Sequence, residues 1–159
     1  MNTRPIALLV EDCPDMAEEL GELLTELGHT FLHVRSRQEA QDLLEQRQFC
    51  YVLTDLQILD RPGSIVPREE AGFAVVEAAR AVYPFRTATG GHTVPVILVT
   101  GYPIDRELVC EAKACGADAV LRKLLSENRP RLEVVIADLL RRGGKACHPA
   151  CGATSREAA

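Results

Sequence analysis

Four apolar runs in the sequence are each followed by a polar residue of a type that a phosphoryl-transfer site needs. The runs cover residues 6–10, 51–54, 94–99 and 119–121, and the polar residues after them are Glu11-Asp12, Asp55, Thr100-Gly101 and Lys123. Clustered carboxylates are hard-oxygen ligands that suit Mg²⁺. An ammonium group neutralises a phosphoryl oxygen, and a hydroxyl donates a hydrogen bond to one. An aspartate is ionised at neutral pH, since its ordinary pKa is about 3.9, so Asp55 can attack phosphorus without a general base.

These residues meet only if the apolar runs are neighbouring parallel strands. The carboxyl ends of parallel strands lie on one edge of a sheet, where open α/β folds bind their ligands. Three carboxylates, a hydroxyl and an ammonium would then share one cleft. Taken singly, each has an ordinary alternative: Glu11-Asp12 could cap a helix, and Asp55, Thr100 and Lys123 could be solvated side chains at strand ends.

The hydrophobic pattern predicts five strand–helix pairs. The expected strands are 6–10, 30–34, 51–54, 94–99 and 119–121. The expected helices are 14–27, one that starts at the capping box 36–39, 71–82, 105–115, and a last one after Pro130 that ends at Gly143-Gly144. Alternating strands and helices predict a doubly wound five-stranded parallel sheet, an α/β fold of the flavodoxin-like order 2-1-3-4-5.

With that order, the chain resembles the receiver domain of bacterial two-component response regulators. The resemblance rests on Glu11-Asp12, Asp55, Thr100-Gly101 and Lys123, each at the end of its strand, and covers residues 4–142. It implies a stand-alone receiver, and the small and polar residues of 143–159 predict a disordered tail after it. It implies a site in which Mg²⁺ is bound by Asp12, Asp55 and the Gln57 carbonyl, with Glu11 acting through water.

The same resemblance implies roles for the remaining residues. Asp55 accepts the phosphoryl group, Lys123 neutralises it, Thr100 donates a hydroxyl to it, and Gly101 leaves room for it. The donor is a histidine kinase or a histidine phosphotransfer protein, and the signal passes to a downstream protein partner. Such a protein turns over no separate substrate, so we do not expect an enzyme.

The sequence departs from the family pattern at two positions. Leu124 follows Lys123 where the family has a proline with a cis bond, and a cis bond before leucine costs about 2.5–4 kcal/mol. Val120 stands where the family has a switch aromatic on the fifth strand. Tyr102 is the nearest aromatic replacement, with an ordinary loop tyrosine as the alternative. These departures favour a second hypothesis, a receiver-like adaptor that is not phosphorylated.

Two connections are longer than the roughly 2–6 residues usual between strands and helices. The segment 56–70 leaves the sheet beside Asp55. It could form a lid over the phosphoryl site or a partner-docking element, or it could be a tolerated surface insertion. The segment 84–93 lies at the opposite end of the sheet, and we expect no chemical role for it.

Composition excludes several other classes. The net charge is −5 with no arginine- or lysine-rich block, which argues against nucleic-acid binding. No apolar stretch approaches a membrane span and no secretory signal is present, so we expect a cytoplasmic protein without membrane contact. The six cysteines are then expected to be thiols, with only a faint metal-ligand pattern at 147–151. A haloacid-dehalogenase-type phosphatase needs a second aspartate at position 57, which is Gln57.

Overall fold

The computed structural model of the chain describes residues 4–83, 94–123 and 125–142. In this part of the chain five parallel strands form one sheet in the order β2-β1-β3-β4-β5, as predicted. The strands are β1 (Ile6–Val10), β2 (Thr30–Val34), β3 (Tyr51–Asp55), β4 (Val96–Thr100) and β5 (Ala119–Arg122). The helices are α1 (Pro14–Glu26), α2 (Arg37–Gln46), α3 (Glu69–Val82), α4 (Arg106–Cys115) and α5 (Leu125–Arg142).

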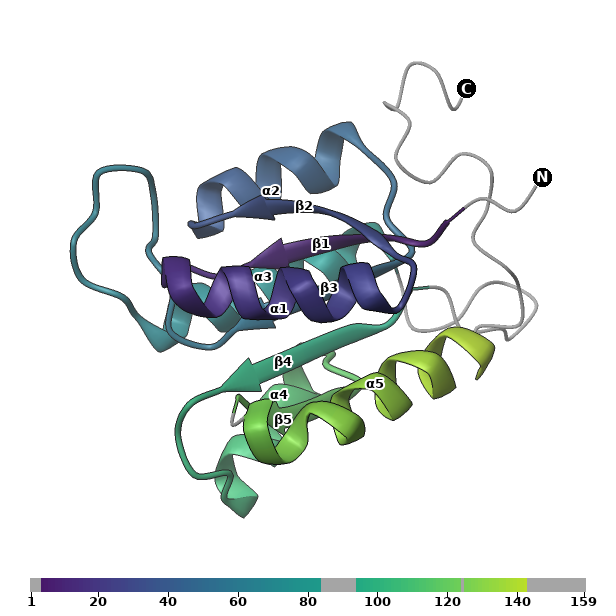
Figure 1. Cartoon of the computed structure of the whole chain (residues 1–159). Coiled ribbons are helices and arrows are strands. Elements are labelled where there is room, and N and C mark those ends of the chain that lie inside the picture. The colour runs from purple at the N-terminus through teal and green to yellow at the C-terminus, as the bar shows by residue number, and fades with distance from the viewer. Residues whose placement is uncertain (1–3, 84–93, 124, 143–159) are drawn as a thin grey trace.

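Helices cover both faces of the sheet (Figure 1). Successive strand residues point to opposite faces, so Leu8 and Val10 pack on one side and Ala7 and Leu9 on the other. The first side is completed by apolar residues of α2, α3 and α4, and the second by those of α1 and α5. Burial on both faces explains why the central strands are apolar throughout.

The helix ends follow the signals in the sequence. Ser36 Oγ accepts a hydrogen bond from the Glu39 backbone N–H at 3.3 Å, and Asp105 Oδ1 accepts one from the Leu108 N–H at 2.8 Å. Gly116 ends α4 with φ of +114°, a left-handed conformation that favours glycine. These caps fix where α2 and α4 begin and where α4 gives way to β5.

Three predicted boundaries need correction. Strand β4 begins at Val96, not 94, because Pro95 has no backbone N–H to donate to a neighbouring strand. Helix α3 begins at Glu69, two residues before the predicted start at 71. The negative charges of Glu69 and Glu70 in its first turn stabilise the positive end of the helix dipole. Helix α5 begins at Leu125, so that Pro130 lies inside it rather than ahead of it. Pro130 is past the first turn, so it lacks the N–H that would donate to the carbonyl four residues earlier, and the helix continues through it with that bond missing.

The prediction that the cysteines are thiols is wrong for Cys50. Cys50 is buried and disulfide-bonded, whereas Cys13, Cys110 and Cys115 are free. The segments 84–93 and 143–159 and Leu124 lie outside the described residues, as do Cys147, His148 and Cys151. Within the described ranges, no helix combines the length and apolar character that crossing a membrane requires.

A buried ion pair ties α3 to the amino-terminal edge of the sheet. The Arg80 guanidinium pairs with Asp118, and it also donates to the carbonyls of Gly116, Tyr83 and Val94. The Asp118 carboxylate accepts the Val96 backbone N–H at 2.7 Å. Because these buried charges have several hydrogen-bond partners, the cost of their desolvation is offset. The clasp lies at the end of the sheet opposite to the acidic residues.

Candidate functional site

The predicted acidic cluster exists at the carboxyl edge of the sheet. Strands β1 and β3 are adjacent and Val10 pairs with Thr54, so the residues that follow or end them come side by side. Each of Glu11, Asp12 and Asp55 offers a carboxylate oxygen, and these oxygens lie within 4.8 Å of one another. Glu11 is fully buried, Asp55 is buried and Asp12 is partly exposed. Three carboxylates at this spacing repel one another when all are ionised, so a cation or a bound proton stabilises the cluster.

Lys123 supplies positive charge to the cluster. Its Nζ lies 2.7 Å from Asp55 Oδ2 and 2.6 Å from Glu11 Oε2. Thr100 pairs with Arg122 at the carboxyl ends of β4 and β5, and the Lys123 backbone N–H donates to the Thr100 carbonyl at 2.9 Å. The sheet itself therefore carries the lysine to the acidic residues.

Burial and charge shift the pKa values of these groups. Desolvation by burial, reinforced by the Asp55 charge, raises the pKa of Glu11 to about 7 against the opposing effect of Lys123. Burial also raises the pKa of Asp55, although Lys123 opposes that shift. Burial disfavours the charged form of Lys123, but the carboxylates of Asp55 and Glu11 outweigh it and raise the pKa of the lysine. The lysine is therefore charged at neutral pH. Its charge offsets only part of the cost of burying the carboxylates, because their pKa values remain raised.

Two contacts from β2 and its end hold the acidic loop, and the sequence reasoning missed both. The Arg35 guanidinium donates to the Asp12 carbonyl from Nη2 at 3.1 Å, and the His33 ring lies 2.7 Å from the Glu11 carbonyl. The Glu11 backbone N–H donates to the Val34 carbonyl. Arg35 directly follows a predicted strand, as the predicted site residues do, although that strand also contains Thr30 and His33 and is not an uninterrupted apolar run.

Thr100 and Gly101 lie beside this cluster at the end of β4. Thr100 is fully buried, and its Oγ1 accepts the Tyr102 backbone N–H at 3.1 Å. The hydroxyl is an acceptor in that bond, so its own proton can be donated to a ligand. Gly101 is exposed, and a Cβ built on it would meet no atom within 4 Å. The space that the sequence predicted beside Gly101 is therefore open.

Gln57, Tyr102 and Val120 lie around this site in ways the sequence did not specify. Gln57 is partly exposed and its Oε1 accepts the Tyr102 hydroxyl at 3.1 Å, linking the loops after β3 and β4. Tyr102 is exposed, while Val120 packs partly buried beside a cavity of about 490 Å³ that Ile104 and Val109 also line. The metal-binding role of the Gln57 carbonyl and the switch roles of Val120 and Tyr102 stay predictions.

The residues present fit a hard divalent cation. Glu11 Oε2 is buried, and its ion-pair partner is the Lys123 ammonium at 2.6 Å. Asp55 shares that one ammonium, and burial still raises the pKa of both carboxyl groups, so a further cation would be favourable in the cluster. Oxygen donors at this spacing match Mg²⁺, which binds one or two carboxylates and keeps several waters.

Comparisons with known proteins bear on the fold. No protein-family model and no curated protein matches the sequence. Among solved structures, a CheY-like response regulator receiver domain from Methanospirillum hungatei JF-1 matches with a TM-score of 0.71 and 21% identity, over 89% of this chain and 98% of that one.

Two further structures have higher identity. A CheY-like receiver domain from Methylobacillus flagellatus matches at 27% identity and a TM-score of 0.61, over 86% of this chain and 99% of that one. The signal receiver domain of a signal transduction histidine kinase from Syntrophus aciditrophicus matches at 29% identity and a TM-score of 0.58, over 87% of this chain and 89% of that one. The predicted fold is thus confirmed by both the strand order and these neighbours.

Proposed function

We propose that this chain, whose fold is that of the response-regulator receiver domains, accepts a phosphoryl group on Asp55 from a phosphohistidine donor. The observation that supports the proposal most is the position of Lys123, whose Nζ contacts both Asp55 and Glu11 in one buried cluster. Three carboxylates with one ammonium leave a site that further positive charge would stabilise. Phosphoryl transfer depends on that kind of positioned charge.

The reaction forms one bond and breaks one. An oxygen of Asp55 forms the new P–O bond while the P–N bond to the donor imidazole breaks, and the leaving imidazole takes up a proton. Asp55 is held for this at the end of a buried strand, with its backbone in register with β4. Because the backbone of Asp55 is held in the sheet beside β4, little motion is needed to align its carboxylate.

Lys123 and Thr100 act on the phosphoryl oxygens. The Lys123 ammonium, already beside Asp55, neutralises one oxygen of the transferred group. The buried Thr100 hydroxyl donates to another, and the open space at Gly101 admits the group. When bound by Asp12, Asp55 and the Gln57 carbonyl, with Glu11 through water, Mg²⁺ supplies further positive charge for the phosphoryl oxygens.

The proposal extends to partners and setting. We infer a histidine kinase or histidine phosphotransfer protein as donor and a protein partner as receiver of the signal, with the cytoplasm as the location. One solved neighbour is itself the receiver domain of a histidine kinase. The chain would consume one phosphoryl group per cycle and convert no separate substrate, so it would not be classed as an enzyme.

A second candidate function is a receiver-like adaptor that binds a partner without phosphorylation. The observation in its favour is Val120, which fills the middle of β5 beside a cavity where the family has a switch aromatic. Leu124, the other departure, lies outside the described residues.

Incubation with acetyl phosphate and Mg²⁺, followed by intact-mass measurement, separates the two functions. We expect a mass increase of one phosphoryl group that disappears on addition of EDTA beforehand and in Asp55→Asn. Asp15→Asn, which changes an exposed carboxylate in the first turn of α1, is the matched control and keeps the increase. A wild-type protein whose mass does not change with acetyl phosphate supports the adaptor instead.

A further inference from the structure

The connection between β3 and α3 is a fixed structure with its own cavity. Leu56 and Ile58 are fully buried at its start. Ile58 and Arg68 pair as an antiparallel bridge, in which each backbone N–H donates to the other residue's carbonyl. The pairing closes the connection into a loop over residues 59–67, which extends beyond the carboxyl edge of the sheet (Figure 1).

A second set of hydrogen bonds fixes the loop to α2. The backbone N–H of Arg37 donates to the Leu59 carbonyl at 2.9 Å, and that of Gln38 donates to the Asp60 carbonyl at 3.0 Å. Gly63 forms the tip with φ of +91°, and the Ser64 N–H donates to the Arg61 carbonyl. With its two ends and one side fixed, the loop presents its outer residues in one arrangement and loses little entropy on binding.

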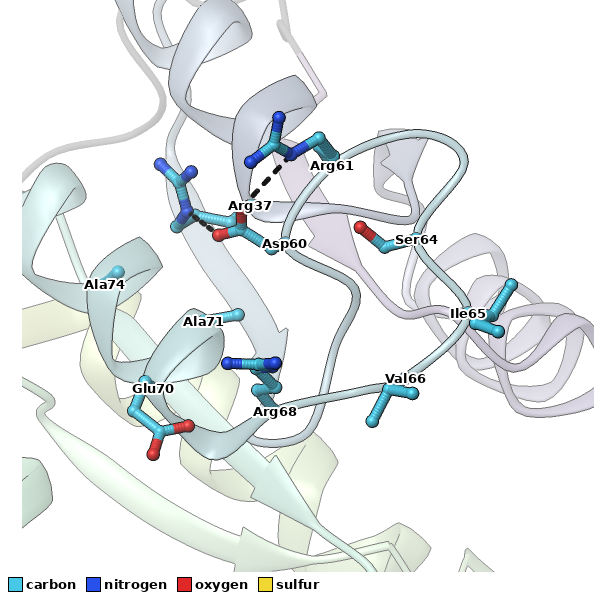
Figure 2. A pocket seen from close by; sticks show the side chains of 10 residues that line it. All are labelled: Arg37, Asp60, Arg61, Ser64, Ile65, Val66, Arg68, Glu70, Ala71 and Ala74. Atoms are coloured by element: carbon cyan, nitrogen blue, oxygen red, sulfur yellow. Dashed lines mark hydrogen bonds and ion pairs between the residues drawn. The ribbon is translucent and has the colours of Figure 1, made fainter.

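Between this loop, α2 and α3 lies a cavity of about 740 Å³. We call it the loop pocket and define it by Arg37, Asp60, Arg61, Ile65, Val66 and Arg68. The Asp60 carboxylate lies between Arg37 and Arg61, at 2.5 Å and 3.7 Å from their Nε atoms (Figure 2). The pKa of Asp60 is lowered, by Arg37 first and by Arg61 and Arg68 as well, so three guanidinium groups act on one carboxylate.

Positive charge is therefore in excess at the loop pocket, although the whole chain carries a net charge of −5. The only other acid in its lining is Glu70, which leaves three cations against two anions. The Arg61 side chain is 71% exposed and so can turn toward a ligand. Guanidinium groups bind carboxylates with two parallel hydrogen bonds, which gives them both affinity and geometry.

Apolar side chains stand next to these charges. Ile65 is 90% exposed and Val66 59% exposed, and Figure 2 shows them pointing outward from the loop, away from Arg37 and Asp60. Exposure of an aliphatic side chain to water is unfavourable, and this loop is held in place and cannot fold over to bury it. Burial of these side chains against a partner protein would be favourable.

We propose that the loop pocket docks an acidic peptide segment of a partner protein, in which carboxylates alternate with apolar side chains. The carboxylates would pair with Arg61 and Arg68, and the apolar side chains would cover Ile65 and Val66. The surface does not use the phosphoryl site, so this inference does not rest on the proposed function.

The test uses a fluorescein-labelled peptide of alternating glutamate and leucine, with a glutamine–leucine peptide of equal length as its neutral partner. Binding to the full chain is followed by fluorescence anisotropy. We expect the acidic peptide to bind and the neutral one to bind at least about tenfold more weakly, with affinity falling as salt is added. Backbone amide signals that shift in an NMR titration should be those of 58–68 and the start of α2.

Substitutions on exposed side chains keep the fold intact. Arg61→Glu with Arg68→Glu should weaken binding about tenfold or more, and Ile65→Ser with Val66→Ser severalfold. Arg106→Glu, an exposed arginine on α4, is the matched control and should bind normally, as should Asp55→Asn. Equal binding of both peptides, no binding, or unchanged binding by the charge-reversed protein overturns the proposal. Displacement of the peptide by inorganic phosphate at equal concentration also overturns it, in favour of a small-anion site.

Discussion

The Lys123 ammonium lies 2.7 Å from Asp55 Oδ2 and reaches the same buried cluster as Glu11. Since Lys123 and Asp55 end different strands, only the parallel sheet brings them together. The contact explains how a carboxylate can be buried at a sheet edge, because the ammonium offsets part of the cost of its desolvation.

Replacement of Lys123 tests that contact. Lys123→Met should slow phosphorylation of Asp55 by acetyl phosphate about a hundredfold, because it removes a positive charge aimed at the transferred group. Initial rates from intact-mass time courses measure the effect. Arg122→Met, at the neighbouring position, should change the rate by less than about threefold. Equal rates for Lys123→Met and the wild type would remove the lysine from the mechanism.

Glu11 should make stability depend on pH. Its pKa is raised from 4.5 to about 7 in the fold, by burial first and Asp55 second. The folded state therefore binds the proton more tightly than the unfolded state, so this contribution is present below pH 4.5 and is lost as the pH rises through 7. In metal-free buffer, Glu11→Gln should raise the free energy of unfolding by about 1–3 kcal/mol at pH 8 and by much less at pH 5.

Urea unfolding at the two pH values measures this difference. Glu18→Gln, an exposed position on α1, serves as the control and should show no such pH dependence. A Glu11→Gln variant that is equally destabilised at both pH values would argue that the carboxylate is stabilising, contrary to its burial.

Mg²⁺ affinity should fall as the pH drops below 7. A protonated Glu11 cannot accept a hydrogen bond from a metal-bound water as strongly as its carboxylate, so the cation competes with the proton. Calorimetric titrations at pH 8 and pH 6 should show weaker binding at the lower pH, together with proton release on binding. Affinity that does not vary over this range would exclude Glu11 from the metal site.

The Arg80–Asp118 clasp should matter for stability and not for chemistry. Removal of one member of a buried ion pair leaves a charge without compensation, so Arg80→Ala should lower the free energy of unfolding by about 3–5 kcal/mol. Arg106→Ala, at an exposed position, should lower it by less than about 0.5 kcal/mol. Urea unfolding compares the two, and a loss for Arg80→Ala as small as the control's would refute the role of the clasp.

Gly72 should be required by the backbone of the loop after β3. A Cβ on Gly72 would lie 2.0 Å from the Leu56 carbonyl oxygen, which is backbone and cannot turn aside. Gly72→Ala should therefore destabilise the fold by about 1–3 kcal/mol and displace the residue next to Asp55. At Gly21 a Cβ would lie 2.6 Å from the Phe31 ring, a side chain that can move, so Gly21→Ala should destabilise the fold less. Thermal unfolding of both variants measures the difference. The reverse ranking would contradict this account.

The sequence predicted the sheet because its strands are buried on both faces and therefore carry uninterrupted apolar runs. It also placed Glu11, Asp55 and Lys123 at one edge, because the carboxyl ends of parallel strands all lie on the same edge of the sheet. It misplaced the start of α5 because Pro130 has the signature of a boundary yet is tolerated inside the helix.

Other features depend on tertiary contacts that no local pattern encodes. The hydrogen bond between Tyr102 and Gln57 joins two loops far apart in the sequence. The loop pocket arises because Ile58 pairs with Arg68 and the loop also pairs with α2, whereas the sequence of 56–70 left a lid, a partner-docking element and a tolerated insertion open.

The central claim is that Asp55 becomes esterified by phosphate. Borohydride reduction of the phosphorylated protein converts an aspartyl phosphate to homoserine, which peptide mass mapping locates to one residue. The account predicts homoserine at position 55, dependent on Mg²⁺. Homoserine at position 12, or none after incubation with both a phosphoryl donor and Mg²⁺, would contradict it.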